Sequence, residues 1–161
     1  MLKTHFSFAV LLTAAGAVPF LFCGGLVLLD PVDSPAAIQA LIAYGAVILS
    51  FLGAVHWGFL LGGQAGAATT TLAGRQVLGL GVLPALIGWL ALLILLRLHA
   101  PAFALFLLLA GFFLTVVMET IGRGRNLVAA DYLILRWSVS VVVLLILLVV
   151  LGAVLSGMRT G

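Results

Sequence analysis

The sequence predicts an all-α, polytopic membrane helix bundle of five transmembrane helices, with the N-terminus inside and the C-terminus outside. Three observations lead to this prediction. Hydrophobic residues make up 65% of the 161 residues and charged residues only 7%, against about 45–50% and about 25% in soluble domains. The sequence contains five apolar stretches, and each is close in length to the roughly 20 residues that a helix needs to cross the hydrocarbon core, or longer. The segments between them carry unequal numbers of basic residues, which orients the chain.

The five predicted spans cover residues 7–29, 36–62, 77–96, 101–118 and 137–158, and together they form a single membrane domain, 1–161. The first apolar run continues past a possible cleavage site at 15–17 as far as Leu29, which favours an uncleaved helix over a signal peptide. Ser34 is expected to cap the second helix, with Pro35 in its first turn. The segments 63–76, 97–100 and 119–136 are expected to be loops or turns.

Basic residues predict the orientation of the bundle. One side of the predicted topology holds Lys3, Arg75, Arg123, Arg125 and Arg136, and the other side holds Arg97 and Arg159. The more basic side is expected to face the cytoplasm. The net charge of +3 therefore reflects orientation, and no basic tract is long enough to bind nucleic acid. The expected partners are membrane lipids, and other inner-membrane protein subunits are candidates.

A ridge of small residues on the second predicted helix indicates close packing against other helices, because small side chains let helix backbones approach in lipid. Its members are Gly45, Ala46, Ser50, Gly53, Ala54, Gly58 and Gly62. The packing partner is either another helix of this chain or a second protein. We expect this helix to be the most buried of the five, and both Gly53→Leu and Ala54→Phe to disrupt folding.

The candidate functional residues gather at the expected inner face of the membrane. They are His56, Trp57, Arg123, Arg125, Tyr132 and Arg136. Guanidinium groups, an imidazole and aromatic rings at a headgroup boundary suit an acidic lipid, an anionic ligand or an acidic loop of a partner. The alternative is independent anchoring of each helix end. Glu119 and Arg123, four residues apart, would pair if the fourth helix extended inward.

Catalytic, metal-binding and cofactor motifs do not stand out in the sequence. The four acids, Asp30, Asp33, Glu119 and Asp131, are expected in loops or at helix ends, and no paired carboxylates, HExxH, GxSxG or phosphate loop occurs. The single cysteine, Cys23, is expected to pack as a small apolar residue. A haem held by His5 and His56 is a remote alternative. We therefore expect no metal, no cofactor and no enzymatic activity.

The run from Tyr44 to Gly58, YGAVILSFLGAVHWG, resembles the signature of the transmembrane protein 69-like family, domain of unknown function 3429. The Pro19 region and the segments 83–89 and 132–136 are similar to further family segments, although Ala129 and Asp131 stand where a proline and a tryptophan are expected. The resemblance covers nearly the whole chain. It implies about five helices and a bacterial inner membrane, and it implies no activity.

Two functions follow as hypotheses. The first is a non-enzymatic accessory or assembly subunit of an inner-membrane complex, suggested by the small-residue ridge and the short loops. The second is a small transporter or binder of an apolar molecule, such as a quinone, porphyrin or lipid. Its basis is the pair of prolines inside helices, Pro19 and Pro84, and the position of His56 on a glycine-lined side.

Overall fold

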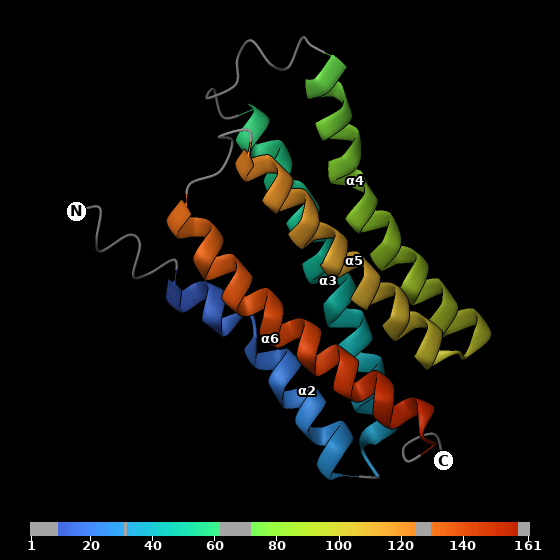
Figure 1. The fold of residues 1–161 in the computed structure, drawn as a ribbon. Helices are drawn as coiled ribbons and strands as arrows, with labels where there is room; N and C mark the ends of the chain where they lie inside the picture. The colour runs from blue at the N-terminus through green and yellow to red at the C-terminus, as the bar shows by residue number, and fades with distance from the viewer. Residues whose placement is uncertain (1–9, 31, 62–71, 125–129, 158–161) are drawn as a thin grey trace.

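The structure is a computed structural model that describes residues 10–30, 32–61, 72–124 and 130–157 (Figure 1). Side-chain surroundings are described within these ranges except at 56, 58–61, 72–78, 122–124 and 130–135. The described chain contains helices and no strands, and five of its helical segments are long and apolar enough to cross a membrane. The predicted fold class is confirmed. Which side each terminus faces stays a prediction.

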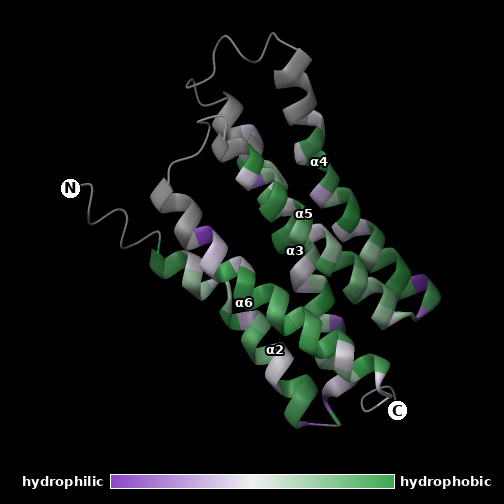
Figure 2. Cartoon of the chain, in the orientation of Figure 1, coloured by the Kyte–Doolittle hydropathy of each residue, from purple (hydrophilic) through white to green (hydrophobic). Residues whose placement is uncertain are grey.

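The helices follow one another in an order that matches the five predicted spans. A helical stretch at 10–15 and a turn lead into α2 (Val18–Leu29), followed by α3 (Ser34–Leu61), α4 (Leu72–Leu93), the π-helical turn η1 (Ile94–Leu98), α5 (Pro101–Gly124) and α6 (Ala130–Leu155). Figure 2 shows that hydrophobic residues colour most of each helix, while a hydrophilic segment marks the turn between α2 and α3.

Three helices extend into segments that the sequence assigned to loops. α4 begins at Leu72, α5 continues to Gly124 and α6 begins at Ala130, so the expected loops at 63–76 and 119–136 are partly helical. Hydropathy detects the stretch of chain that matches the hydrocarbon core. A helix can continue beyond that stretch, because its backbone hydrogen bonds do not depend on apolar side chains.

The turn between α2 and α3 is organised by Asp30. Its Oδ1 accepts hydrogen bonds from the backbone N–H groups of Val32 at 2.9 Å and Asp33 at 3.3 Å, which is the local hydrogen bonding that makes aspartate a turn residue. Ser34 is buried, and its hydroxyl has no hydrogen-bond partner among the described residues. The predicted Ser34 cap is therefore wrong, since Asp30 supplies the side-chain bonds at this turn.

The first span is interrupted just before Pro19, where the missing N–H of proline breaks the regular bonding. Gly16 and Ala17 form the turn, and the Gly16 carbonyl accepts a hydrogen bond from the Tyr44 hydroxyl of α3 at 3.0 Å. The Phe20 ring packs edge-on against Tyr44, with centroids 5.1 Å apart, and against Phe112 of α5 at 5.8 Å. These contacts tie the first span to both α3 and α5.

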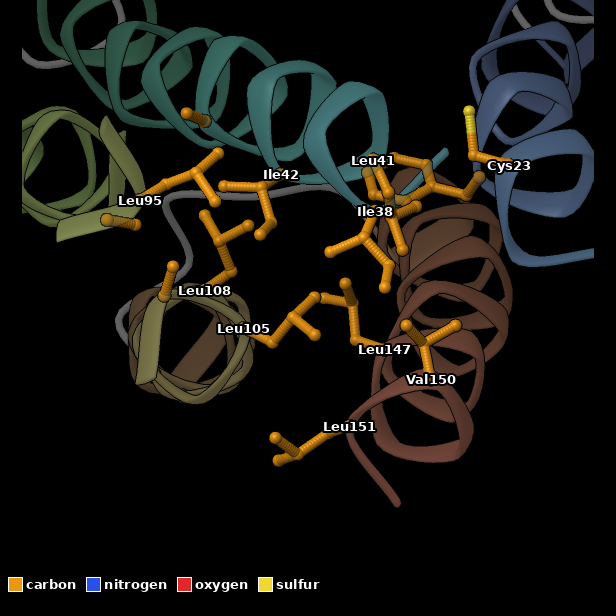
Figure 3. Packing of buried hydrophobic residues seen from close by; sticks show 14 of the residues in the cluster. Cys23, Ile38, Leu41, Ile42, Leu95, Leu105, Leu108, Leu147, Val150 and Leu151 are labelled. Carbon is orange, nitrogen blue, oxygen red and sulfur yellow. The ribbon is translucent and has the colours of Figure 1, made fainter. Parts of the chain in front are cut away.

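α3 lies at the centre of the bundle, where it packs against α2, α4 and α5. In Figure 3, Ile38 and Leu41 of α3 point toward Leu105 of α5 and toward Leu147 and Val150 of α6, and all five are buried. In the membrane-spanning window of α3, 44% of residues are buried, against 28–39% in the other four windows. This confirms that the second span is the most buried of the five.

The backbones of α3 and α4 are in direct contact. A Cβ atom added to Gly53 of α3 would collide with the carbonyl oxygen of Gly81 in α4. A Cβ added to Gly88 of α4 would lie 2.9 Å from the carbonyl oxygen of Ala46. Only glycine at these positions permits so close an approach, which is how small residues hold helices together in lipid.

The predicted small-residue ridge does not form one continuous contact. Its buried members are Gly45, Ala46 and Gly53, its exposed members are Ser50 and Ala54, and the side-chain surroundings of Gly58 and Gly62 lie outside the described residues. The Ser50 hydroxyl donates back to the Ala46 carbonyl of its own helix at 2.9 Å. Within this chain, disruption is therefore expected from a larger residue at position 53, while disruption by Ala54→Phe would require a partner chain on the exposed side of α3.

We expect Gly53→Ala to lower the free energy of unfolding by about 1–3 kcal/mol, because the new methyl group meets a rigid backbone carbonyl. Gly152→Ala in α6 is the matched control, since nothing lies within 4 Å of the added Cβ. The control should be neutral or up to about 1 kcal/mol stabilising, as expected for Gly→Ala inside a helix. Thermal unfolding in detergent measures both. If the Gly53→Ala variant melted at the same temperature as the parent, α3 and α4 would not be in backbone contact.

We also expect a reporter inserted in the turn at 30–34 to be located outside the cytoplasm, because the more basic side of the chain faces inward. A paired alkaline phosphatase and fluorescent protein fusion at this position measures the location. Activity of the phosphatase supports the orientation, whereas fluorescence alone would reverse it.

Candidate functional site

A buried ion pair joins α5 to α6. The Nε of Arg136 donates a hydrogen bond to Oε1 of Glu119 at 2.9 Å, and the two side chains are 12% and 5% exposed. Glu119 stands five residues before the end of α5 and Arg136 six residues after the start of α6. At about 1.5 Å per residue, each lies roughly 7–9 Å inside its helix. The pair is therefore part of the packed bundle.

Each member of the pair keeps one polar atom free. Oε2 of Glu119 and Nη2 of Arg136 are buried and have no hydrogen-bond partner among the described residues. A buried polar atom without a partner loses its hydration without compensation, which costs on the order of 1–3 kcal/mol and more for a charged group. The hydrogen bonding of the pair is therefore incomplete among the described residues.

A cavity of about 290 Å³ lies beside Arg136, between the first span, α3, α5 and α6. Its wall is mainly apolar and includes Phe20, Ile48, Phe112 and Val143. This volume is just below the lower limit of about 300 Å³ found for small-molecule sites, which are commonly apolar with a few polar groups. Arg136 is the charged residue of the described lining.

The exposure of the lining residues shows where the cavity opens. Leu12 of the first span and Phe51 of α3 line it and are 58% and 62% exposed. Phe20, Leu52 and Phe112 line it and are buried. The cavity therefore has its opening on the outer surface of the bundle, near the first span and α3.

The space between α3 and α6 explains why the cavity exists. α6 packs along α2 and α5, and it makes little or no direct backbone contact with α3. Toward one end of the bundle, apolar side chains from both helices fill the gap (Figure 3). Toward the Arg136 end, Val139, Ser140 and Val143 of α6 face the cavity instead.

Two members of the predicted inner-face patch have described side chains, and they make different contacts. Trp57 lies against α4, because a Cβ on Gly81 would be 2.8 Å from its indole ring. Arg136 pairs with Glu119 on α5. The side chains of His56, Arg123, Arg125 and Tyr132 lie outside the described residues, so a shared site of all six stays a prediction.

The Glu119–Arg136 pair was missed by sequence reasoning. From the sequence, Glu119 was expected in a loop or at a helix end, and Arg136 in the inner-face patch or as an anchor of a helix end, whereas both lie inside helices. The alternative pair, Glu119 with Arg123, involves a side chain that is not described. One signal could have found the observed pair. Extending both helices inward places one acid and one base on neighbouring antiparallel helices at similar depth.

We expect Glu119→Leu and Arg136→Met, made singly, each to destabilise the protein by about 3–5 kcal/mol, because either change leaves a buried charge unbalanced. The double variant should be close to the parent in stability, since replacing both partners by apolar residues is often neutral. Thermal unfolding in detergent measures the stabilities of the parent, the two single variants and the double variant. Arg97→Met, at an exposed arginine, is the control. Additive losses in the double variant would contradict a direct pair.

Comparison with known proteins is consistent with this architecture. A family model described as "Protein of unknown function (DUF3429)" matches residues 6–152. "Transmembrane protein 69" of Xenopus tropicalis is 39% identical over 85 residues, which cover 53% of this chain and 32% of that relative. The aligned region thus spans about a third of the relative's length, and no solved structure matches significantly. As the resemblance predicted, the chain belongs to the DUF3429 family, and it is a multi-pass membrane protein.

Proposed function

We propose that the protein is a non-enzymatic membrane protein that binds a small apolar molecule inside its helix bundle. The observation that carries this proposal is the apolar cavity of about 290 Å³ with Arg136 in its wall. Small-molecule sites typically combine a predominantly apolar surface with a few polar groups that fix orientation. A quinone, a porphyrin and a lipid are the candidate ligands, and the cavity volume favours a slender molecule over a full porphyrin ring.

The position of the opening supports entry from the bilayer. Leu12 and Phe51 at the opening are exposed and apolar, so a lipid-soluble molecule can reach the cavity without crossing a polar barrier. Thr13, Ser140 and Arg136 are the polar residues of the described lining. A hydroxyl nucleophile needs an adjacent base, and the described lining of the cavity holds no carboxylate or imidazole. These features favour binding over chemistry.

An accessory or assembly role in a bacterial inner-membrane complex is the second proposed function. The observation that favours it is the position of α4, which packs mainly on α3 and α5 and lies at one edge of the bundle (Figure 1). Leu83, Leu86 and Trp89 of α4 are exposed and are covered either by lipid or by another membrane subunit. Nucleic acid is not among the proposed partners, since the described helices offer a lipid-facing surface.

Native mass analysis after extraction in mild detergent separates the two functions. We expect one apolar molecule to remain bound to each protein chain. Val139→Phe should abolish this binding, because Val139 lines the cavity and a larger ring occupies its space. Val142→Phe is the matched control at an exposed position of the same helix, and it should retain the molecule.

Two results would contradict ligand binding in this cavity, and a third would favour the accessory role. A parent protein that carries no small molecule, or a Val139→Phe variant that carries as much as the parent, would refute ligand binding in this cavity. A stoichiometric second protein without a small molecule would favour the accessory role.

A further inference from the structure

We infer that the cavity takes up the hydrocarbon chain of a lipid-like molecule, whose polar head group stays outside the cavity at the membrane surface. The inference rests on the proposed function and specifies which part of the ligand enters the bundle. It follows from three properties of the described lining: its depth in the membrane, its change of polarity with depth, and the volume that it encloses.

The depth of the cavity follows from the positions of its lining residues in their helices. On α6 the lining begins at Arg136, where the membrane-spanning window begins, and extends to Val143, seven residues further on. On α3 it reaches Ile48, seven residues before the window ends at Val55. Figure 1 shows that α6 begins and α3 ends toward the same end of the bundle. At about 1.5 Å per residue, the cavity extends roughly 10 Å inward from that end, which is within one half of a hydrocarbon core of about 30 Å.

The polarity of the lining changes along this depth. Its polar side chains, Thr13, Arg136 and Ser140, stand within four residues of the ends of their membrane-spanning windows. The lining side chains that stand deeper are apolar, and they are Phe20, Ile48, Phe112 and Val143. A head group among these deeper side chains would lose its hydration without gaining hydrogen bonds, whereas a hydrocarbon chain has no polar group to satisfy. The lining therefore favours a molecule whose chain points inward and whose head group lies at the membrane surface.

The volume of the cavity limits how much of a chain it can hold. An apolar cavity of about 150 Å³ binds one molecule of benzene. On the same scale, the cavity of about 290 Å³ holds about a dozen carbon atoms. This is enough for one chain along the depth of the cavity and too little for a porphyrin ring. The cavity therefore fits the first carbons of one chain, and a longer chain would continue into the bilayer.

The opening of the cavity gives such a chain a lateral entrance. Leu12 and Phe51 line the cavity, are more than half exposed and belong to membrane-spanning windows. A chain can pass between the first span and α3 while its head group remains at the membrane surface. Two sources supply this chemistry: the straight acyl chain of a phospholipid and the branched tail of an isoprenoid.

Photolabelling with lipids that are reactive at different depths tests the inference. The full-length protein is reconstituted into vesicles of dioleoyl phosphatidylcholine that contain one of two phosphatidylcholine probes. The distal probe carries a diazirine at about the tenth carbon of one acyl chain, within the length that the cavity holds. The proximal probe carries the diazirine beside the ester carbonyl. Peptide mass spectrometry then identifies the labelled residues.

Val143 is the informative position, because it lines the cavity and is only 4% exposed, so that a lipid on the outer surface reaches it poorly. We expect the distal probe to label Val143 about tenfold more than the proximal probe does. Labelling by the proximal probe would require a buried ester, and a buried polar group without a partner carries a penalty of about this weight. The proximal probe should label Leu12, near the end of the first span.

Val139→Phe obstructs the cavity between its surface end and Val143, because Val139 lies between Arg136 and Val143 on the α6 wall. Labelling of Val143 by the distal probe should fall by about tenfold, since the added ring overfills the space, while labelling of Leu12 should persist. Val142→Phe, at an exposed position of the same helix, is the matched control and should behave as the parent. The comparison of the two probes on the parent protein holds whether or not either variant folds.

The outcomes separate the inference from the proposed function. Labelling of Val143 by the proximal probe as strong as that by the distal probe overturns the inference, because the head group would then lie inside the cavity. Absence of Val143 labelling with both probes overturns it as well. In both cases, an apolar molecule detected on the parent by native mass analysis leaves the proposed function standing, whereas a parent that carries no such molecule refutes the proposed function.

Competition identifies the source of the chain where the distal probe labels Val143 as expected. Dodecanol supplies a straight chain and farnesol a branched isoprenoid chain, and each carries a hydroxyl head group. Stronger suppression of Val143 labelling by dodecanol indicates an acyl lipid, and stronger suppression by farnesol indicates an isoprenoid. Either result supports the inference, whereas failure of both competitors to reduce the labelling shows that it does not come from a saturable site and overturns it.

Discussion

The close approach of α3 and α4 is the constraint on which the arrangement of the bundle depends. In hydrocarbon, an apolar side chain gains little by leaving lipid for protein, so helices are held together by the fit of their surfaces. Gly53 meets the backbone of Gly81, and Gly88 meets that of Ala46. Because α2 and α5 also pack on α3, the position of this one helix sets the positions of three neighbours.

The aromatic contacts of the first span explain why α6 stays away from α3 near Arg136. Phe20 stands between Tyr44 of α3 and Phe112 of α5, edge-on to both, and the Tyr44 hydroxyl holds the Gly16 carbonyl. The interruption before Pro19 frees this carbonyl to accept a side-chain hydrogen bond. The first span therefore lies beside both helices at the level where the cavity forms, and α6 packs against α2 and α5.

The sequence predicted the number and order of the spans because apolar length is a direct consequence of bilayer thickness. It placed the helix ends wrongly, since hydropathy does not detect a helix such as α5 that continues past Glu119. It identified Ala46 and Gly53 as packing positions, but it also placed Ser50 and Ala54 on the ridge, and these two are exposed. The pair of Glu119 with Arg136 requires knowledge of which helices are neighbours, and no local pattern contains it.

Stability alone is a poor explanation for a buried ion pair. Removing two charges from water costs several kcal/mol for each ion, and well-packed apolar residues in their place are often as stable or more so. The Glu119–Arg136 pair also leaves Oε2 and Nη2 without partners among the described residues, so its hydrogen bonding is incomplete. A guanidinium that is neutralised on one side and borders a cavity on the other fits a binding role. There, Glu119 makes it possible for Arg136 to be buried beside an apolar wall.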